Sequence, residues 1–220
     1  MIEKTTAGRL RRAALLIVTA GILLPAFSVS DAVAESPVRI LAPRDGATLP
    51  PGNALLIGKR LSGHISRVEV EVNGRGGRVV AIPHGAFRTT VTLAPGRNVI
   101  RVTAGESHAA ITVSASAKGR YRYHPDVEKC AECHGDGGKD FAVTGPKDGL
   151  CYKCHDRKDG KKHVHGPLGG GDCTSCHDPH GSENGALTVA AAETLCRGCH
   201  DQKSSERHVR NSRGKSCTAC

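Results

Sequence analysis

The pattern of apolar and polar residues changes twice along the chain. An apolar run near the N-terminus is followed by short apolar runs separated by turns, and then by a long stretch with few large apolar side chains. Such changes mark changes of structure, because each kind of element has its own apolar period. The sequence therefore predicts three segments, residues 1–34, 35–117 and 118–220.

The middle segment has the pattern of an antiparallel β protein. Its clearest strand, Val68-Glu69-Val70-Glu71-Val72, alternates between apolar and charged residues and ends at Asn73-Gly74, a dipeptide typical of two-residue hairpins. The seven expected strands cover residues 38–41, 54–57, 68–72, 79–82, 87–93, 98–103 and 109–113. Seven short strands separated by turns over about 80 residues predict an all-β sandwich.

The first segment has the parts of an export signal. Four basic residues precede an apolar run from Ala13 to Phe27, and Ala32-Val33-Ala34 supplies small residues for cleavage after Ala34. The run has about 15 residues, whereas a membrane-spanning helix needs roughly 20. We therefore expect an exported protein, periplasmic or on the outer surface, with no transmembrane segment after signal cleavage.

The last segment contains all ten cysteines of the chain. Four runs of Cys-x-x-Cys-His are present, and the chain ends in Cys217-Thr-Ala-Cys220. Each run is typical of c-type haem attachment, in which two thiols add across two vinyl groups and the adjacent histidine binds the iron. We expect covalently bound haem c at four complete sites and at a fifth that is cut by the C-terminus. The expected haem-binding residues are Cys130, Cys133 and His134; Cys151, Cys154 and His155; Cys173, Cys176 and His177; Cys196, Cys199 and His200; and Cys217 with Cys220.

Zinc sites and disulfide bonds are the alternatives for paired cysteines. A zinc site needs four ligands, so it would join two Cys-x-x-Cys pairs and leave the following histidine without a role. That histidine is nevertheless present in every copy that has a following residue. The pattern favours haem, and zinc sites and disulfide bonds remain the alternatives.

The number of histidines predicts two histidine ligands for each iron. Of 12 histidines, three lie in the middle segment, where we expect them at the surface, and nine lie in the last segment. Four of the nine belong to the motifs, and five are spare: His124, His163, His165, His180 and His208. Five irons with two histidines each need ten, which is these nine and one directly beyond the end. Irons with histidine on both faces are typical of low-potential electron carriers. The sequence leaves open which spare histidine serves which iron, and whether His163 or His165 is instead a surface residue.

The last segment has too few large apolar residues to form an ordinary core. About 100 residues of this composition cannot bury enough apolar surface to offset the loss of chain entropy. Stacked porphyrins would supply the missing core. We expect an irregular domain of loops and short helices that is organised by covalent haems.

An internal repeat of 45 residues makes a pair of attachment sites the repeating unit. The stretch from Leu150 to Asp156 matches that from Leu195 to Asp201, and a further attachment site precedes each. The segment resembles the doubled-CXXCH family of multihaem c-type cytochromes, which is related in design to class III cytochromes. Residues 173–181, ending in Cys-His-Asp-Pro-His-Gly, carry the most specific part of this resemblance. An end within a motif leads us to expect a chain that is truncated at its C-terminus.

The middle segment resembles the immunoglobulin-like domains of bacterial surface proteins. Its Pro43-Arg44-Asp45-Gly46 opening and the alternating strand that ends in Asn-Gly carry the resemblance. This resemblance implies a spacer or a binding module.

The net charge of +10 is concentrated outside the haem motifs. Residues 35–118 carry 11 Lys or Arg against five Asp or Glu, whereas residues 119–220 carry 16 against 14. Haem propionates would lower the charge of the second part further. We expect redox partner proteins or extracellular electron acceptors and no nucleic acid. The basic sandwich would contact an anionic cell surface or polysaccharide, or would serve solubility alone.

The sequence thus predicts an exported multihaem c-type cytochrome that relays electrons in a respiratory or extracellular electron-transfer chain. It is expected to be a carrier and not an enzyme. One alternative is a multihaem reductase whose open haem site lies in downstream sequence. A zinc-binding adhesion protein is the other.

Overall fold

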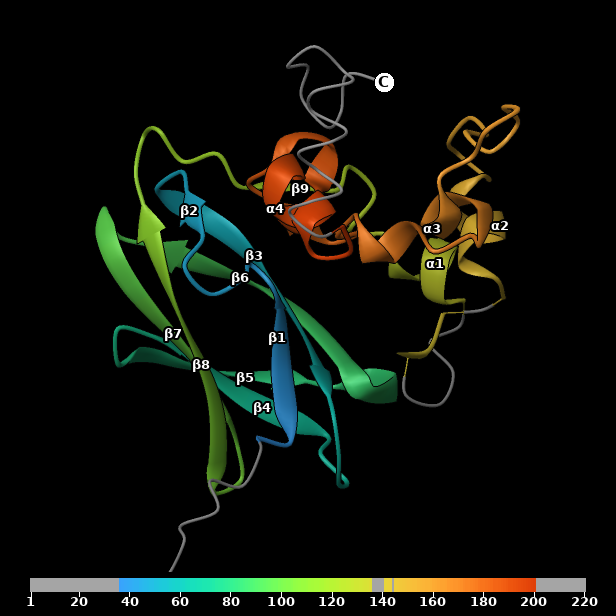
Figure 1. The fold of residues 1–220 in the computed structure, drawn as a ribbon. Coiled ribbons are helices and arrows are strands. Elements are labelled where there is room, and N and C mark those ends of the chain that lie inside the picture. Colours follow the sequence, from blue (N-terminus) through green and yellow to red (C-terminus); the bar gives the residue numbers. More distant parts are fainter. Residues whose placement is uncertain (1–35, 136–140, 144, 201–220) are drawn as a thin grey trace, which may run out of the picture. The chain divides into compact units, whose positions relative to one another are not determined.

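The computed structural model describes residues 36–135, 141–143 and 145–200 (Figure 1). These residues all belong to one compact unit of the chain, Glu35–Cys220. The expected signal peptide, His208, Cys217 and Cys220 lie outside the described residues, and the expected boundary at residue 117 stays a prediction. Within the described ranges, no helix has the length and apolar character needed to cross a membrane.

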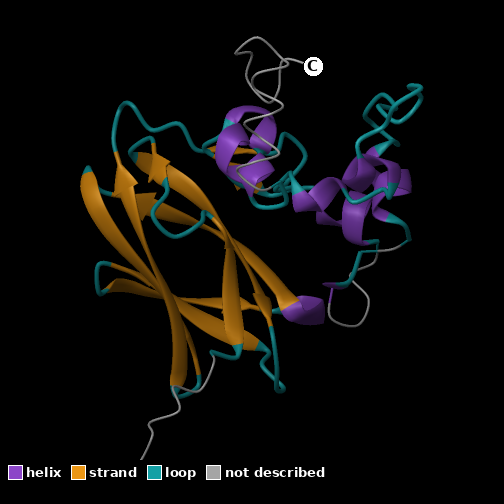
Figure 2. Cartoon of the chain, in the orientation of Figure 1, coloured by secondary structure: helices purple, strands orange, loops and turns teal. Residues whose placement is uncertain are grey.

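Residues 38–115 form two β-sheets that pack as a sandwich (Figure 2). One sheet has the order β1-β3-β6 and the other the order β2-β8-β7-β4-β5. Neighbouring strands are antiparallel except β2 and β8, which are parallel. The strands are β1 (Val38–Ala42), β2 (Thr48–Leu49), β3 (Gly52–Arg60), β4 (Arg67–Val72), β5 (Arg75–Ala81), β6 (Ala86–Leu93), β7 (Gly96–Ala104) and β8 (Ser107–Ala115).

All seven expected strands are confirmed, each with longer bounds than the apolar run that predicted it. The strand β2 was not predicted, because two residues between turns show no period. Strands β1, β3 and β6 share one sheet and β4, β7 and β8 the other, as strands A, B, E and C, F, G do in immunoglobulin-type sandwiches.

The predicted hairpin joins β4 to β5. Asn73 and Gly74 have φ values of 55° and 70°, which are the left-handed conformations that a type I′ turn requires at both central residues. The side chain of Asn73 also accepts a hydrogen bond from the Val99 amide at 2.8 Å. The turn is therefore tied to the neighbouring strand β7.

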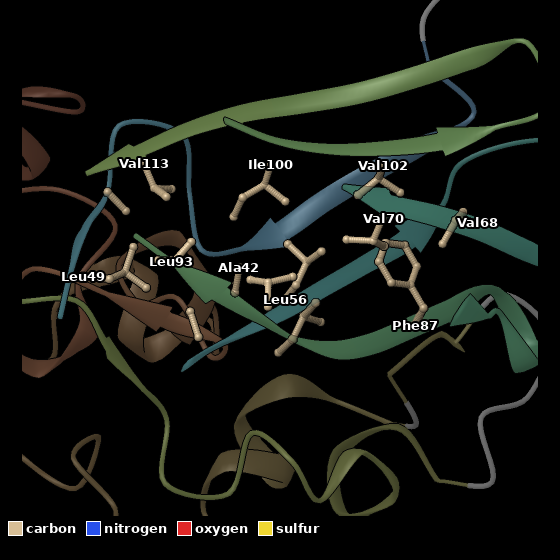
Figure 3. Packing of buried hydrophobic residues seen from close by; sticks show 14 of the residues in the cluster. Ala42, Leu49, Leu56, Val68, Val70, Phe87, Leu93, Ile100, Val102 and Val113 are labelled. Atoms are coloured by element: carbon tan, nitrogen blue, oxygen red, sulfur yellow. The ribbon is translucent and has the colours of Figure 1, made fainter. Parts of the chain in front are cut away.

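The core of the sandwich lies between the two sheets. Val68 and Val70 of β4 are buried while Glu69 between them is exposed, as the alternation predicts. Figure 3 shows side chains of both sheets, among them Leu56, Phe87 and Ile100, filling the space between the layers. Gly58 packs so tightly against the Phe87 ring that an added Cβ would lie 2.3 Å from it. No larger residue fits there.

The chain after residue 121 has short elements and no apolar core of its own. Its helices are α1 (Cys130–His134), α2 (Lys147–Cys151), α3 (Gly166–Gly169) and α4 (Ala192–Arg197), and β9 (Arg122–Tyr123) pairs with β10 (Gly181–Ser182). The last buried apolar side chain of the described residues is Tyr121. The expectation of a loop-rich segment with short helices is confirmed.

Three contacts tie this segment to strands of the sandwich. The Tyr123 hydroxyl donates to the Leu55 carbonyl at 2.7 Å. The Thr48 carbonyl accepts from the amides of residues 120 and 121, each at 3.0 Å. The guanidinium Nε of Arg44 donates to Asp178 Oδ2 at 2.6 Å. The last contact joins the first turn of the sandwich to the third Cys-x-x-Cys-His motif.

Candidate functional site

Each of the four Cys-x-x-Cys-His motifs forms one helical turn. The first motif makes up the whole of α1. In the other three, the histidine amide donates to the carbonyl of the first cysteine: His155 to Cys151 at 3.0 Å, His177 to Cys173 at 3.0 Å, and His200 to Cys196 at 2.9 Å. Residues three apart on a helical turn share one face, so the spacing of two residues sets both thiols on the same side.

None of the eight described cysteines, those of the four complete motifs, forms a disulfide bond. Four pairs of cysteines outside disulfides, each followed by an imidazole, match the donor set that covalent haem attachment requires. Across the parts of the chain that the structure describes, no three His, Cys, Asp or Glu side chains gather as a metal site.

The first three motifs lie next to one another. Burial, and then the neighbouring Cys154 thiol, raise the pKa of the Cys133 thiol. Burial, and then the neighbouring Cys173 thiol, raise the pKa of the Cys151 thiol in the same way. Since charge effects between thiols act at short range, the first motif adjoins the second and the second adjoins the third.

A polar contact fixes the second motif against the third. Lys147, the first residue of α2, reaches Asp172 Oδ1 at 3.3 Å and the Thr174 hydroxyl at 2.9 Å. Asp172 directly precedes the third motif, and Thr174 lies within it. The helix that ends at the second motif is therefore bonded to the turn that forms the third.

Three of the four motif histidines lie beside a spare histidine. The ring centres are 6.4 Å apart in His134–His180 and 6.0 Å apart in His124–His155. They are 6.1 Å apart in His165–His200. The planes of the rings are inclined by 10° in the first pair, 68° in the second and 34° in the third. No such ring pair within the described residues includes His163 or His177, and His163 is exposed.

The imidazole rings have bonds that orient them. His177 Nδ1 lies 2.7 Å from the Ala186 carbonyl oxygen, and a proton on Nδ1 leaves Nε2 free to bind a metal. The His180 amide donates to Asp178 Oδ1 at 2.9 Å, and His180 Nδ1 lies 3.6 Å from the same oxygen. Burial, and then the neighbouring His180 ring, lower the pKa of His134.

Asp178 and Arg44 form an ion pair beside the third motif. Burial by itself raises the pKa of Asp178, but hydrogen bonds from His180 and Arg44 outweigh it and lower that pKa to about 2. The place of Asp178 between His177 and His180 is visible in the sequence. Arg44 precedes it by 134 residues, and no sequence pattern connects the two.

Comparison with known proteins supports the reading of the motifs. The model of the family described as "Doubled CXXCH motif" matches residues 165–205, which contain the third and fourth motifs. No curated protein matches the sequence. The doubled motif indicates a haem-binding c-type cytochrome, and a c-type motif implies an exported protein.

Solved structures similar to part of this chain come from several kinds of protein. An FMN-binding beta-glucuronidase from Facaelibacterium prausnitzii L2-6 is 19% identical with a TM-score of 0.32, and the match covers 39% of this chain and 12% of that one. The fibronectin(III)-like modules of CbhA from Clostridium thermocellum are 17% identical with a TM-score of 0.27, over 36% of this chain and 96% of that one. A modular endo-beta-1,4-mannanase from Cellulomonas fimi is 22% identical with a TM-score of 0.28, over 39% of this chain and 19% of that one.

Proposed function

We propose that this protein is an exported multihaem c-type cytochrome that relays electrons through closely spaced haems, each with histidine on both faces of its iron. It would act as a carrier in a respiratory or extracellular electron-transfer chain. The observation that carries this proposal is the set of four helical turns, each with two cysteines outside any disulfide and a following histidine, of which the second is bonded to the third.

The residues of the chain hold and orient the cofactor. In each motif, the two thiols would hold the haem through thioether bonds, formed by addition of each S–H across a vinyl group without an oxidant. The motif histidine would be a ligand of its iron. Haem supplies an iron that cycles between the ferric and ferrous states. Adjacent motifs keep neighbouring haems close, and a short separation is what makes electron hopping fast.

The sandwich would serve as a docking module. Its segment carries the larger part of the net positive charge of residues 35–220, and Arg75 and Arg78 of strand β5 are exposed. Exposed positive charge attracts anionic partners from a distance and speeds their association. Redox partner proteins, extracellular acceptors and an anionic cell surface or polysaccharide are the partners that this charge fits.

Haem counting tests the proposal. The full chain is produced in a host that matures c-type cytochromes, and its mass and pyridine haemochrome content are measured. We expect one added haem for each complete motif. A Cys173→Ala/Cys176→Ala variant should carry one haem fewer, whereas an Asn53→Ala variant in the sandwich should carry the same number. A protein that gains no haem mass would overturn the proposal.

Ligand binding separates the carrier from a reductase. With histidine on both faces, ferric haems should be low-spin, and nitrite should not change the absorption spectrum. A spectral shift that saturates with nitrite would show an iron open to substrate and would favour an enzyme.

A further inference from the structure

We propose that His180, His124 and His165 are the second iron ligands of three particular haems. His180 would face His134 at the first motif, His124 would face His155 at the second, and His165 would face His200 at the fourth. This assignment rests on the proposed function and goes beyond it, since it names the partner of each iron.

The spacing of the rings is what a shared metal requires. A bond of about 2.0 Å joins an imidazole nitrogen to a metal, and the ring centre lies about 1.1 Å beyond that nitrogen. Two imidazoles on opposite sides of one metal therefore have ring centres a little over 6 Å apart. The three observed distances are 6.0, 6.1 and 6.4 Å.

Ordinary ring packing does not explain the selection of partners. Aromatic rings pack with centres between about 4.5 and 7 Å apart, so distance alone is compatible with simple contact. Each of the three pairs, however, joins one motif histidine to one spare histidine, and each uses a different spare histidine. The His134–His180 planes are inclined by only 10° at 6.4 Å, so these two rings are nearly parallel. A metal between the rings accounts for both the selection and the spacing.

His180 is held in place by Asp178. Asp178 bonds the backbone amide of His180 and lies 3.6 Å from its Nδ1, which leaves Nε2 for the iron. Asp178 is itself bonded to Arg44. Asp178 is thus a positioning residue, and Arg44 acts through it. Because His177 belongs to the third motif and His180 faces the first, one short loop would bind two neighbouring irons and fix their separation.

The contrast between His163 and His165 follows from the same geometry. The two residues lie two positions apart and both are exposed, but His165 is paired with His200 whereas His163 has no ring partner within the described residues. The second ligand of the iron at His177 is not assigned, and His208 lies outside the described residues.

Carbon monoxide titration of the ferrous holoprotein tests the assignment. Carbon monoxide binds ferrous haem only where one face of the iron is open. The variants His180→Ala, His124→Ala and His165→Ala should each gain one carbon monoxide-binding haem per chain relative to the wild type, with an unchanged haem count. The control His108→Ala, on exposed residue 108 of β8, should gain none.

Removal of one attachment site identifies the iron that each ligand serves. In a Cys130→Ala/Cys133→Ala background, which lacks the first haem, His180→Ala should no longer add a carbon monoxide-binding haem. In a Cys196→Ala/Cys199→Ala background, which lacks the fourth haem, His180→Ala should still add one carbon monoxide-binding haem. His165→Ala should add none in that background. If His180→Ala adds a carbon monoxide-binding haem in both backgrounds, His180 does not bind the iron of the first motif. The assignment of His180 is then wrong.

The outcomes separate this assignment from the proposed function. A wild-type protein without haem contradicts the proposed function itself. A protein with its full haem count in which His180→Ala opens no iron contradicts only the assignment.

Substitution by methionine provides a second test that keeps six ligands. The change from histidine to methionine as an axial ligand raises the reduction potential of a haem. His180→Met should therefore raise the potential of one haem and leave the haem count unchanged. A set of potentials identical to the wild type would overturn the assignment of His180.

Discussion

Asp178 is one of the few buried polar residues, and its bonds make it a fixed negative charge beside an expected iron ligand. It accepts hydrogen bonds from the His180 amide and from Arg44. Although burial alone favours the neutral acid, these bonds hold the pKa of Asp178 at about 2. A carboxylate beside a ligating imidazole makes that ligand more basic and stabilises ferric iron.

Replacement of Asp178 should therefore change one reduction potential. We expect Asp178→Asn to raise the potential of the haem at the first motif by tens of millivolts, because a negative charge near the iron is lost. Spectroelectrochemical titration of the holoprotein measures this. The control Asp159→Asn, on a residue paired with Arg157 at 2.6 Å, should leave all potentials as they are. A uniform shift of every haem would contradict a local role for Asp178.

Asn98 shows what a single buried polar residue contributes to the sandwich. It is fully buried, its side-chain amide donates to the carbonyls of residues 94 and 96, and its oxygen accepts from the Ala94 amide at 3.0 Å. These bonds close the turn between β6 and β7. Asn98→Ala would leave these buried backbone groups without partners.

We expect Asn98→Ala to lower the free energy of unfolding by about 2 to 4 kcal/mol, because each unsatisfied buried group costs roughly 1 to 3 kcal/mol. Denaturant unfolding followed by far-UV circular dichroism measures it. The exposed Asn53, which bonds only the Thr92 hydroxyl among the hydrogen bonds described, is the matched control. Asn53→Ala should cost less than about 0.5 kcal/mol. Equal losses in the two variants would contradict this account of Asn98.

At the scale of elements, the two parts of the chain are stabilised differently. The strands of the sandwich are long and bury one face, whereas the helices α1 to α4 have four to six residues each. A helix of one turn does not persist in water by its own hydrogen bonds. The motif turns therefore need tertiary contacts, and the cofactor that the thiols would bind would stabilise them further.

Strand β9 provides one of these tertiary contacts. The Tyr123 hydroxyl donates to the Leu55 carbonyl of β3 at 2.7 Å. Burial outweighs this hydrogen bond and raises the pKa of Tyr123 from 10.0 to about 12. A raised pKa means that folding favours the neutral phenol. This contribution is complete below the unfolded pKa near 10 and is lost as pH rises through about 12.

We expect Tyr123→Phe to cost about 1 kcal/mol of stability at neutral pH through the lost hydrogen bond. Between about pH 10 and 12 the difference from the wild type should shrink, because the phenylalanine ring has no proton to lose. Unfolding midpoints measured across this range test the prediction. The control is Tyr152→Phe. The Tyr152 hydroxyl accepts a longer hydrogen bond of 3.4 Å from the Lys158 amide, so its loss should lower the free energy of unfolding by less. A difference that grows with pH would contradict the raised pKa of Tyr123.

At the scale of the whole molecule, the conventional core of the described residues is that of the sandwich. Its buried apolar side chains fill the space between two sheets, and the partly buried Tyr123 and Val127 pack against it from the following segment. The segment with the motifs has ten cysteines and nine histidines instead. The covalent haems would therefore be its core as well as its chemistry.

Limited proteolysis of apoprotein and holoprotein tests this division. In a chain produced without haem attachment, we expect cleavage throughout the segment after Tyr123 and survival of a fragment that contains residues 38–115. The holoprotein should resist cleavage in both parts, because haem burial would order the second. Equal resistance of the apoprotein in both parts would show that the second part folds without haem.

The sequence alone determined those features that local patterns encode. Alternation at Val68–Val72 and the Asn73-Gly74 turn fixed a strand and a hairpin, because side-chain direction and φ are local properties. The spacing within each Cys-x-x-Cys-His motif predicted two thiols on one helical turn for the same reason. The identity and count of the candidate ligands were likewise readable from the sequence.

Only the tertiary structure decided which of these residues meet. His134 and His180 are 46 positions apart, and Arg44 and Asp178 are 134 apart. The residues that flank them in the sequence do not predict these contacts, because the contacts arise from how β9, β10 and the motif turns pack. The two-residue strand β2 was hidden for the same reason, since its pairing with β8 and not its own period makes it a strand. Local conformation and the identity of the candidate ligands can be predicted from the sequence. The pairing of residues that are distant in the sequence depends on the packing of the whole chain.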